Sequence, residues 1–384
     1  MNTAHGAERY IRRKKPIYLD SKCTTPLPIP IDIENLIVHK IIVAHGAKEA
    51  CEQASDQNVY GSLAVTYCET EGGQTPPFFI EVDKHAPIHI LDSHNLSIIL
   101  SELDTVTDLS RYLDTKIRAV EKFDSLVYCG EEDLLGHYLL NFDSEKNEHV
   151  IGTDDEDINE IYTGEGEWHD FINTDIYKNT KNEDRASYFW DELIQRTCQN
   201  ALDGVLGGNS DIMRGKSAIF DMVKEPRFMR RALAKRMMQA VANFPDHPTQ
   251  LTRHVAFMPS FIADVGYVFF QLRVPESMKQ EPDYREKRIT LLEIACGAAK
   301  NKFPNLKKVI GIGIDAPKFS GETNSEDFIL LPCEEWTDEV REHDEELNQE
   351  WNFFGTSALE QSNEHITQFV PPEEAGVKPV ENGW

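Results

Sequence analysis

The chain has 384 residues, of which 40% are apolar and 9% aromatic. That supply of apolar side chains suffices for a sizeable core and excludes global disorder. Asp and Glu number 66 against 39 Lys and Arg, so the formal charge is −27, and this negative field argues against a general nucleic-acid coat protein. Because single domains usually hold roughly 100–200 residues, we expect two folded units.

The N-terminal residues and the cysteines indicate the compartment. Residues 1–13 are charged and hold no apolar signal-peptide core, and no stretch approaches the roughly 18 consecutive apolar residues that span a membrane. The seven cysteines are an odd number without a CxxC pair, as is typical of reduced thiols. We therefore expect a cytoplasmic protein that has no membrane partner.

Residues 1–35 are basic and then proline-rich, which predicts an extended arm. An N-terminal α/β domain is expected at 36–142. Short β-branched and aromatic runs predict its strands at 36–43, 62–67, 78–82, 88–91 and 125–129. Helical patterns predict its helices at 47–55, 96–103, 109–123 and 131–141.

Residues 143–185 are rich in Asp, Glu, Gly and Asn, which predicts an acidic linker or insertion. A C-terminal α/β domain is expected at 186–354 and a disordered tail at 355–384. The domain's strands are predicted at 254–258, 266–274, 309–314 and 328–331, and its helices at 186–202, 226–244, 283–302 and 338–351. Asp283 and Glu286 predict a capping box. The fold class is therefore α/β or α+β, with a mixed sheet covered by helices in each unit.

Five stretches of the sequence stand out together: ELDTVTDLSRYL (102–113), GEEDLLGHYL (130–139), YREKRITLLEIACGAAKNKFP (284–304), VIGIGIDAP (309–317) and SEDFILL (325–331). They resemble an uncharacterised family of bacterial proteins. The resemblance spans most of residues 36–340 and implies a bacterial, cytoplasmic protein with a two-part architecture. It implies no activity, fold or cofactor.

The helix expected at 226–244 carries a run of basic residues with no acidic residue among them: Arg227, Arg230, Arg231, Lys235 and Arg236. Arg227, Arg230, Arg231 and Lys235 share one face by their i, i+3, i+4 spacing. Guanidinium groups match phosphate oxygens, so this face is a candidate phosphate-binding site for nucleic acid or a nucleotide. The alternative is that it docks internally on the acidic segment or on the acidic helix near 338–350.

Residues 264–273 place an acid before a strand and a Q-x-R sequence on it. Because side chains alternate along a strand, Gln271 and Arg273 share a face, as in the second half of a PD-(D/E)xK nuclease site. Asp264 would hold Mg²⁺, and Glu192 could join it. The ordinary interpretation is a Gln and an Arg paired with sheet neighbours.

Nitrogen and oxygen donors gather in the stretch that contains Asp83, His85, His89, Asp92 and His94. No recognised metal-binding spacing is present, so surface histidines beside a strand are the preferred interpretation and no metal is assigned.

The glycine-containing strand at 309–314 leads into a polar loop that contains Asp315, Glu322, Glu326 and Asp327. Such a turn could hold the phosphate of a nucleotide, although close packing on the helix at 283–302 also explains the glycines. No nucleophilic triad is identified.

The first functional hypothesis is a partner-binding or regulatory scaffold, with a protein partner and an association with bacterial defence functions. The second is a divergent Mg²⁺-dependent nuclease that uses Asp264, Gln271 and Arg273 and holds nucleic acid on the basic helix. The third is a nucleotide or small-molecule binder that uses the loop after residue 314. Whether the chain is an enzyme and its oligomeric state stay open.

Overall fold

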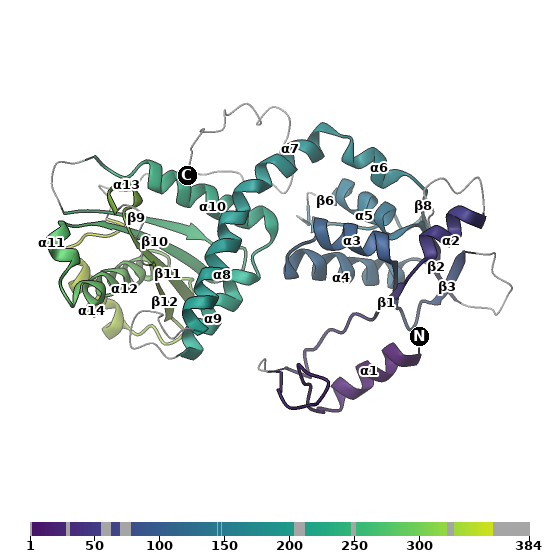
Figure 1. Cartoon of the computed structure of the whole chain (residues 1–384), viewed down its shortest axis with the longest axis horizontal. Coiled ribbons are helices and arrows are strands. Elements are labelled where there is room, and N and C mark those ends of the chain that lie inside the picture. Colours follow the sequence, from purple (N-terminus) through teal and green to yellow (C-terminus); the bar gives the residue numbers. More distant parts are fainter. Residues whose placement is uncertain are drawn as a thin grey trace. The chain divides into compact units, whose positions relative to one another are not determined.

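A computed structural model describes residues 2–27, 31–54, 63–69, 78–143, 145–146, 148–202, 212–246, 251–320 and 326–355. The chain divides into two compact units: unit 1 is Met1–Asp104 with Asp108–Thr174, and unit 2 is Thr105–Thr107 with Asp175–Trp384. Both contain mixed sheets flanked by helices (Figure 1). The predicted class, α/β or α+β with mixed sheets covered by helices, is confirmed. No described helix is both long and apolar enough to cross a bilayer.

Unit 1 alternates short strands and helices along the chain. Its strands are β1 (Ile41–Ala44), β2 (Ala64–Cys68), β3 (Phe79–Asp83), β4 (His89–Asp92), β5 (Ser125–Cys129), β6 (Phe142–Asp143), β7 (Glu148–His149) and β8 (Glu160–Thr163). Its helices are α1 (Asn2–Arg12), α2 (Ala47–Ala54), α3 (Ser93–Glu102), α4 (Val106–Lys122), α5 (Glu131–Leu140) and α6 (Glu167–Ile172).

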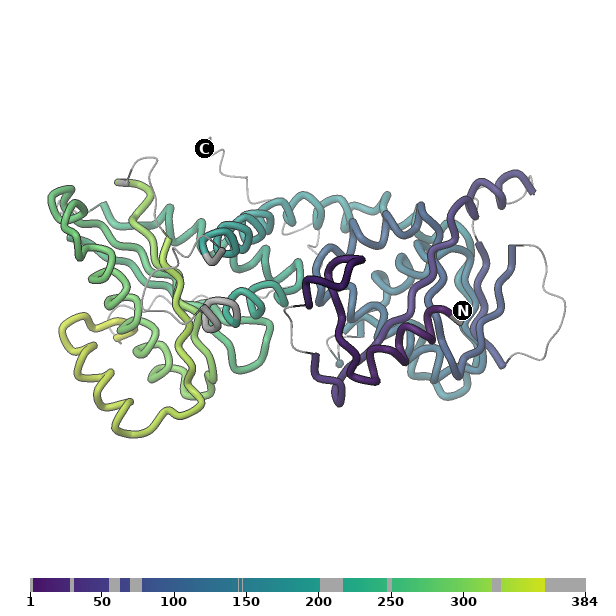
Figure 2. The backbone as a smooth tube through the Cα atoms, turned by 60° about the horizontal axis from the view of Figure 1, so that its bottom comes forward, coloured from purple at the N-terminus to yellow at the C-terminus, as the bar shows by residue number. Residues whose placement is uncertain are grey.

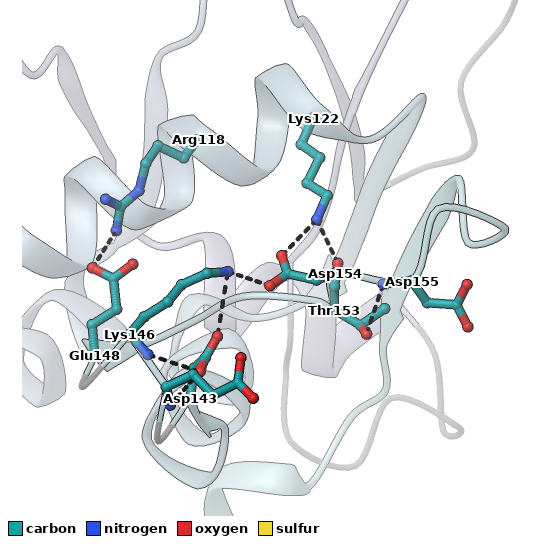
Figure 3. A network of polar contacts seen from close by, with 9 residues as sticks. Arg118, Lys122, Asp143, Lys146, Glu148, Thr153, Asp154 and Asp155 are labelled. Atoms are coloured by element: carbon teal, nitrogen blue, oxygen red, sulfur yellow. Dashed lines mark hydrogen bonds and ion pairs between the residues drawn. The ribbon is translucent and has the colours of Figure 1, made fainter.

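The main sheet of unit 1 has the strand order β3-β2-β5-β8, and β1 and β4 form a separate parallel pair. Strand β8 comes from the acidic segment at 143–185 and pairs with β5 in parallel. The preceding residues of that segment are tied to α4 by the ion pairs Arg118–Glu148 (3.3 Å) and Lys122–Asp154 (3.0 Å), drawn in Figure 3. This part of the acidic segment therefore belongs to the fold of unit 1.

A buried ion pair lies inside unit 1. The Lys116 ammonium donates to both carboxylate oxygens of Glu131, at 2.8 and 2.6 Å, and to the Tyr128 hydroxyl at 2.8 Å. The Tyr112 hydroxyl donates to the same carboxylate at 2.7 Å. Both charged side chains are fully buried. Since a buried charge is tolerated only when it is paired and hydrogen-bonded, this network fixes α4 against the start of α5.

Unit 2 contains one four-stranded sheet of β9 (Thr252–Pro259), β10 (Val265–Arg273), β11 (Lys308–Asp315) and β12 (Glu326–Pro332), in the order β12-β11-β10-β9. Its helices are α7 (Asp175–Asp184), the 3-10 turn η1 (Arg185–Ser187), α8 (Tyr188–Leu202), α9 (Ile212–Val223), α10 (Arg227–Ala242), α11 (Glu276–Lys279), α12 (Tyr284–Lys302), α13 (Pro317–Ser320) and α14 (Asp338–Asn348).

Strand β10 lies at the centre of unit 2 because its side chains serve two cores. Tyr267 and Phe269 pack in one cluster with residues of α8, α9 and α10. Val268 and Phe270 point the other way, into a cluster with α12. This alternation follows from the two-residue period of a strand, and a strand buried on both faces reads as a continuous apolar run.

Helix α12 joins the parallel strands β10 and β11 and packs closely on the sheet. A Cβ added at Gly311 would lie 2.8 Å from Cys296 Sγ and 3.0 Å from Leu292 Cγ, both on α12. Close helix packing therefore explains this glycine, as the simpler interpretation of the glycine-containing strand predicted.

A buried arginine fastens α12 to β11 and β12. The Arg288 side chain is fully buried and donates to Asp315 at the end of β11 and to Asp327 on β12, each at 2.7 Å. Arg285, which is 41% exposed, donates to the other oxygen of Asp327 at 2.7 Å. Tyr284 also donates to Asp315. The two carboxylates thus have their charge matched inside the unit.

The sequence placed most of these elements, and the differences are local. The helices predicted at 283–302 and 226–244 correspond to α12 and α10, whereas helices such as α1, α7 and α9 were not predicted. The extended arm expected at 1–35 was wrong for residues 2–12, because they form helix α1. The capping box at Asp283 was wrong, because this residue precedes α12 but its side chain accepts no capping hydrogen bond. The tail predicted at 355–384 falls outside the described residues after residue 355.

We expect Arg288→Met to destabilise unit 2 by roughly 3–5 kcal/mol, because it leaves two buried carboxylates without their common cation. Urea unfolding followed by tryptophan fluorescence measures this change. Arg285→Met is the matched control: it removes a contact to the same Asp327, but from a half-exposed position, and should cost about 1 kcal/mol. Equal losses in the two variants would contradict the assigned role of Arg288.

Candidate functional site

The basic residues predicted to bind phosphate on α10 face carboxylates of unit 2. Arg227 and Arg230 donate to the two oxygens of Asp191 on α8, at 2.7 and 2.6 Å. Arg231 donates to Asp184 at the end of α7 at 2.7 Å, and Lys235 pairs with Glu183. The partners Glu183 and Asp184 belong to the acidic segment that we named as the alternative docking site, whereas Asp191 lies outside it.

The three arginines of this cluster are almost buried. Their side chains are 12%, 8% and 6% exposed for Arg227, Arg230 and Arg231, respectively. Arg230 also donates to the carbonyl oxygens of Glu225 (2.8 Å) and Val223 (2.5 Å), which belong to the end of α9 and the turn after it. These guanidinium groups therefore connect α8, α9 and α10, and phosphate binding by them stays a prediction.

The residues of the predicted nuclease site are not brought together. Asp264 precedes β10, is 39% exposed on its side chain and pairs with Lys307 at 2.9 Å. Gln271 lies seven residues further along the same extended strand, about 23 Å away. It is fully buried and donates to the Ala240 carbonyl at 2.9 Å. One metal ion cannot contact both Asp264 and Gln271 at that separation.

The two other residues considered for that site have different neighbours. The Arg273 guanidinium lies 3.6 Å from the centre of the Phe319 ring, a cation–π contact. Glu192 is exposed on α8.

The donors considered for a metal in unit 1 also serve separate roles. Asp92 caps α3 by accepting from the backbone N–H groups of His94 (2.6 Å) and Asn95 (2.8 Å). His89 is buried, with its Nε2 3.3 Å from Nδ1 of His39. Asp83 accepts from the His85 N–H at 2.9 Å, and both are exposed. Within the described residues, no three His, Cys, Asp or Glu side chains are placed to hold a metal ion.

The polar loop considered for nucleotide binding holds the carboxylates that neutralise Arg288. Asp315 and Asp327 are buried in that network, and the Glu326 side chain pairs with Arg196 at 3.3 Å. Glu322 lies outside the described residues.

Exposed basic side chains gather at the N-terminal arm instead. Residues 9–15 read RYIRRKK, and all five of their cations, Arg9, Arg12, Arg13, Lys14 and Lys15, are exposed. Arg12 pairs with Glu8 at 2.9 Å, and Glu8 also accepts from Lys40 at 3.1 Å. Among the described residues, no ion pair joins the other four to a carboxylate. We call residues 9–18 the basic arm.

The basic arm has a defined backbone. Helix α1 ends at Arg12, and two residues later Lys14 adopts a positive φ of 56°. The chain then returns through a turn held by Asp20, whose carboxylate accepts from the backbone N–H groups of Lys22, Thr24 and Thr25 at 2.6–3.2 Å. These bonds, the one from Thr25 first, lower the pKa of Asp20 to about 2. This turn appears as the dark purple loop beside α1 in Figure 2.

A pocket of about 430 Å³ lies between the end of α1 and this loop. Lys14 and Lys15 line it together with apolar side chains such as Ile11, Ile17 and Leu27. Asp32 and Glu34 also line the pocket, so its charge is mixed. Two partly exposed aromatic rings belong to the basic arm, namely Tyr10 (45%) and Tyr18 (36%). The arm therefore combines exposed cations, aromatic rings and a concave surface that is partly apolar.

Sequence reasoning underrated this arm. The RYIRRKK stretch is plain in the sequence, but we interpreted residues 1–35 as an extended arm and looked for phosphate contacts on α10. Charge density alone does not separate the two clusters. The deciding property is whether carboxylates of the fold surround the cations, and that depends on tertiary contacts.

A second unusual group lies at the start of α5 in unit 1. Burial raises the pKa of Glu132 to about 7, and the nearby carboxylates of Asp133 and Asp92 add to the shift. Its Oε2 atom is buried, with no hydrogen-bond partner among the described residues. Burial likewise raises the pKa of Asp133 to about 6, against the opposing effect of N–H donors from Trp168 and Gly166.

We expect Asp191→Asn to destabilise unit 2 by roughly 1–3 kcal/mol, because the charged acceptor shared by Arg227 and Arg230 is lost. Urea unfolding measures the change. The neighbouring exposed Glu192 gives the matched control, since Glu192→Gln removes the same charge and should change stability by less than about 0.5 kcal/mol. A neutral effect of Asp191→Asn would show that the arginines do not need this partner.

We expect Glu132 to make unit 1 less stable as the pH rises from about 5 to about 7. The folded protein retains a proton that the unfolded chain, with a carboxyl pKa near 4.5, has released, so protonation favours the fold and the benefit disappears above the folded pKa. Glu132→Gln should remove roughly 2 kcal/mol of this decline, measured by urea unfolding at about pH 5.5 and about pH 8. The exposed Glu121 supplies the control, and Glu121→Gln should leave the pH dependence of the wild type unchanged.

Comparisons with known proteins found no match to this chain. No family model matches the chain, and neither a curated protein nor a solved structure matches it. The resemblance of its five stretches to a bacterial family accordingly stays an expectation. The basic arm is the candidate site that these contacts support best.

Proposed function

We propose that this chain is a partner-binding protein that holds single-stranded nucleic acid on its basic arm. The observation that carries the proposal is the contrast between its two basic clusters. The arginines of α10 are nearly buried and paired with carboxylates, whereas Arg9, Arg13, Lys14 and Lys15 are exposed without such partners among the described residues. The cations of the second cluster can bind an external anion without breaking an internal ion pair. The arginines of α10 cannot.

The chemistry of the arm suits the backbone of a nucleic acid. Guanidinium groups form paired hydrogen bonds to phosphate oxygens, and lysine ammonium groups act as mobile point charges. Four exposed cations within seven residues, none of which forms an ion pair in the described part of the chain, can contact successive phosphates. The total charge of −27 opposes approach at long range, but charges separated by more than about 10 Å are screened at ordinary salt.

The aromatic rings favour a single strand over a duplex. Tyr10 and Tyr18 are partly exposed among the cations, and unpaired bases stack on such rings with little dependence on base identity. The pocket beside Lys14 and Lys15 has a volume of about 430 Å³ and a partly apolar lining, which suits a single base. Bases inside a duplex are not available for either contact.

We propose further that the protein acts in a reducing compartment, the bacterial cytoplasm. All seven cysteines are free thiols, and burial raises the pKa of Cys51, Cys296 and Cys333. Thiols held in the protonated form react slowly with disulfides, which suits a protein that keeps its cysteines reduced.

We expect a labelled single-stranded oligonucleotide of about 20 nucleotides to bind the wild-type chain, as measured by fluorescence anisotropy. The logarithm of the affinity should fall with the logarithm of the salt concentration with a slope of about −3, as expected for about four phosphate contacts on a single strand. Replacing Arg9, Arg13, Lys14 and Lys15 by Gln should weaken binding at least about tenfold and flatten this slope.

The matched control changes the same number of charges elsewhere. Lys287, Lys307, Arg196 and Arg341 have side chains that are 48–66% exposed and form ion pairs within unit 2, so their replacement by Gln lowers the net charge equally without touching the arm. Affinity should then change by no more than about twofold. An equal loss in both variants, or no binding by the wild type at low salt, would refute the proposed site.

A further inference from the structure

We infer that Ser93 and His45 form a nucleophile–base pair that reacts with carboxylic esters. The Ser93 hydroxyl and Nδ1 of His45 lie 2.6 Å apart, which is hydrogen-bond distance. Both side chains are exposed, so a substrate can reach them. A serine becomes nucleophilic when an adjacent base accepts its proton, and this contact supplies that base. The site lies in unit 1 and is independent of the basic arm.

The pairing of β1 with β4 brings the two residues together. These strands are parallel, and the last residue of β1, Ala44, is opposite the last residue of β4, Asp92. His45 and Ser93 are the next residues of each chain segment, so both leave the same edge of the pair. The carboxyl edge of parallel strands is where α/β proteins commonly place reactive groups.

The position of Ser93 is fixed by the start of α3. Ser93 is the first residue of this ten-residue helix, and the preceding Asp92 accepts from two N–H groups of its first turn. The Asn95 side chain in turn accepts from the Asp92 N–H at 2.8 Å, which completes a capping box. The backbone around the nucleophile is therefore rigid, as preorganised catalysis requires.

His45 is placed by the turn that follows β1. Gly46 adopts a φ of +76°, which a residue with a side chain rarely adopts, and its carbonyl accepts from the Ala50 N–H at 3.1 Å as α2 begins. This turn directs the chain away from the strand directly after His45. A residue other than Gly at position 46 would strain the turn that positions the base.

The reaction can be written with all atoms accounted for. In the tautomer that carries its proton on Nε2, His45 takes the hydroxyl proton on Nδ1 while Ser93 Oγ bonds to the ester carbonyl carbon, and the carbonyl oxygen takes up the negative charge. The C–O bond to the leaving alcohol then breaks, and the alcohol receives the proton from His45. Water attacks the acyl-Ser93 ester in the same way, which releases the acid and restores the hydroxyl.

The pair also defines its substrate class. Among the described residues, no carboxylate pairs with His45, so no third group stabilises the imidazolium that forms. The leaving alcohol must therefore be one that departs without strong general-acid assistance from His45. Esters of acidic alcohols meet that requirement, whereas amides do not, because amines are poor leaving groups without a strong general acid.

A fluorophosphonate probe tests the pair directly, because serine attack on phosphorus releases fluoride and leaves a covalent mass increase. The wild-type chain should be labelled once, with the mass on the peptide that contains Ser93, and should hydrolyse p-nitrophenyl acetate. Ser93→Ala should abolish both. His45→Gln should slow labelling about 100-fold or more, the usual contribution of a general base.

Ser97→Ala provides the matched control, since Ser97 is exposed on the same helix and should be dispensable. Because Ser93, His45 and Ser97 are all on the surface, the variants should keep the circular dichroism spectrum and unfolding curve of the wild type. Labelling that is no faster than that of urea-unfolded protein, labelling that persists in Ser93→Ala, or an unchanged rate in His45→Gln would each overturn the inference.

Discussion

A charge taken out of water must find its partner inside the protein, and each unit of this chain contains a fully buried cation that meets this requirement. In unit 1 the fully buried Lys116 is held by Glu131 and Tyr128. In unit 2 the fully buried Arg288 lies between Asp315 and Asp327. Because an unpaired buried charge costs several kcal/mol, these contacts leave the attached helices, α4 and α12, few alternative positions.

The same requirement distinguishes two kinds of cation. Buried cations paired with carboxylates stabilise the fold, whereas exposed cations can contact a partner. On α10, Asp184 and Asp191 hold three arginines that would otherwise be a phosphate-binding face. On the basic arm, Glu8 forms ion pairs with Arg12 and Lys40, and the other cations of the arm are exposed and form no ion pair among the described residues. The amount of positive charge is similar in the two places. The two clusters differ in the exposure of their cations and in whether carboxylates pair with them.

Polar chemistry in unit 1 collects where strands end and helices begin. Asp92 caps α3, Ser93 opens it next to His45, and Glu132 lies in the first turn of α5. Helix starts offer unsatisfied N–H groups, which attract carboxylates and hydroxyls for structural reasons alone. A reactive pair can arise within this ordinary arrangement when a base from a neighbouring strand comes within hydrogen-bond distance.

The sequence by itself determined the mixed α/β or α+β class and the central strands and helices such as β10 and α12, because local periodicity and composition record which faces are apolar. Only the tertiary structure decided which polar residues meet. Asp264 and Gln271 are close in sequence but lie at opposite ends of a strand, whereas His45 and Ser93 are distant in sequence but adjacent in space. The physical reason is that a polar contact depends on strand order and helix docking, which leave no periodic trace in the chain.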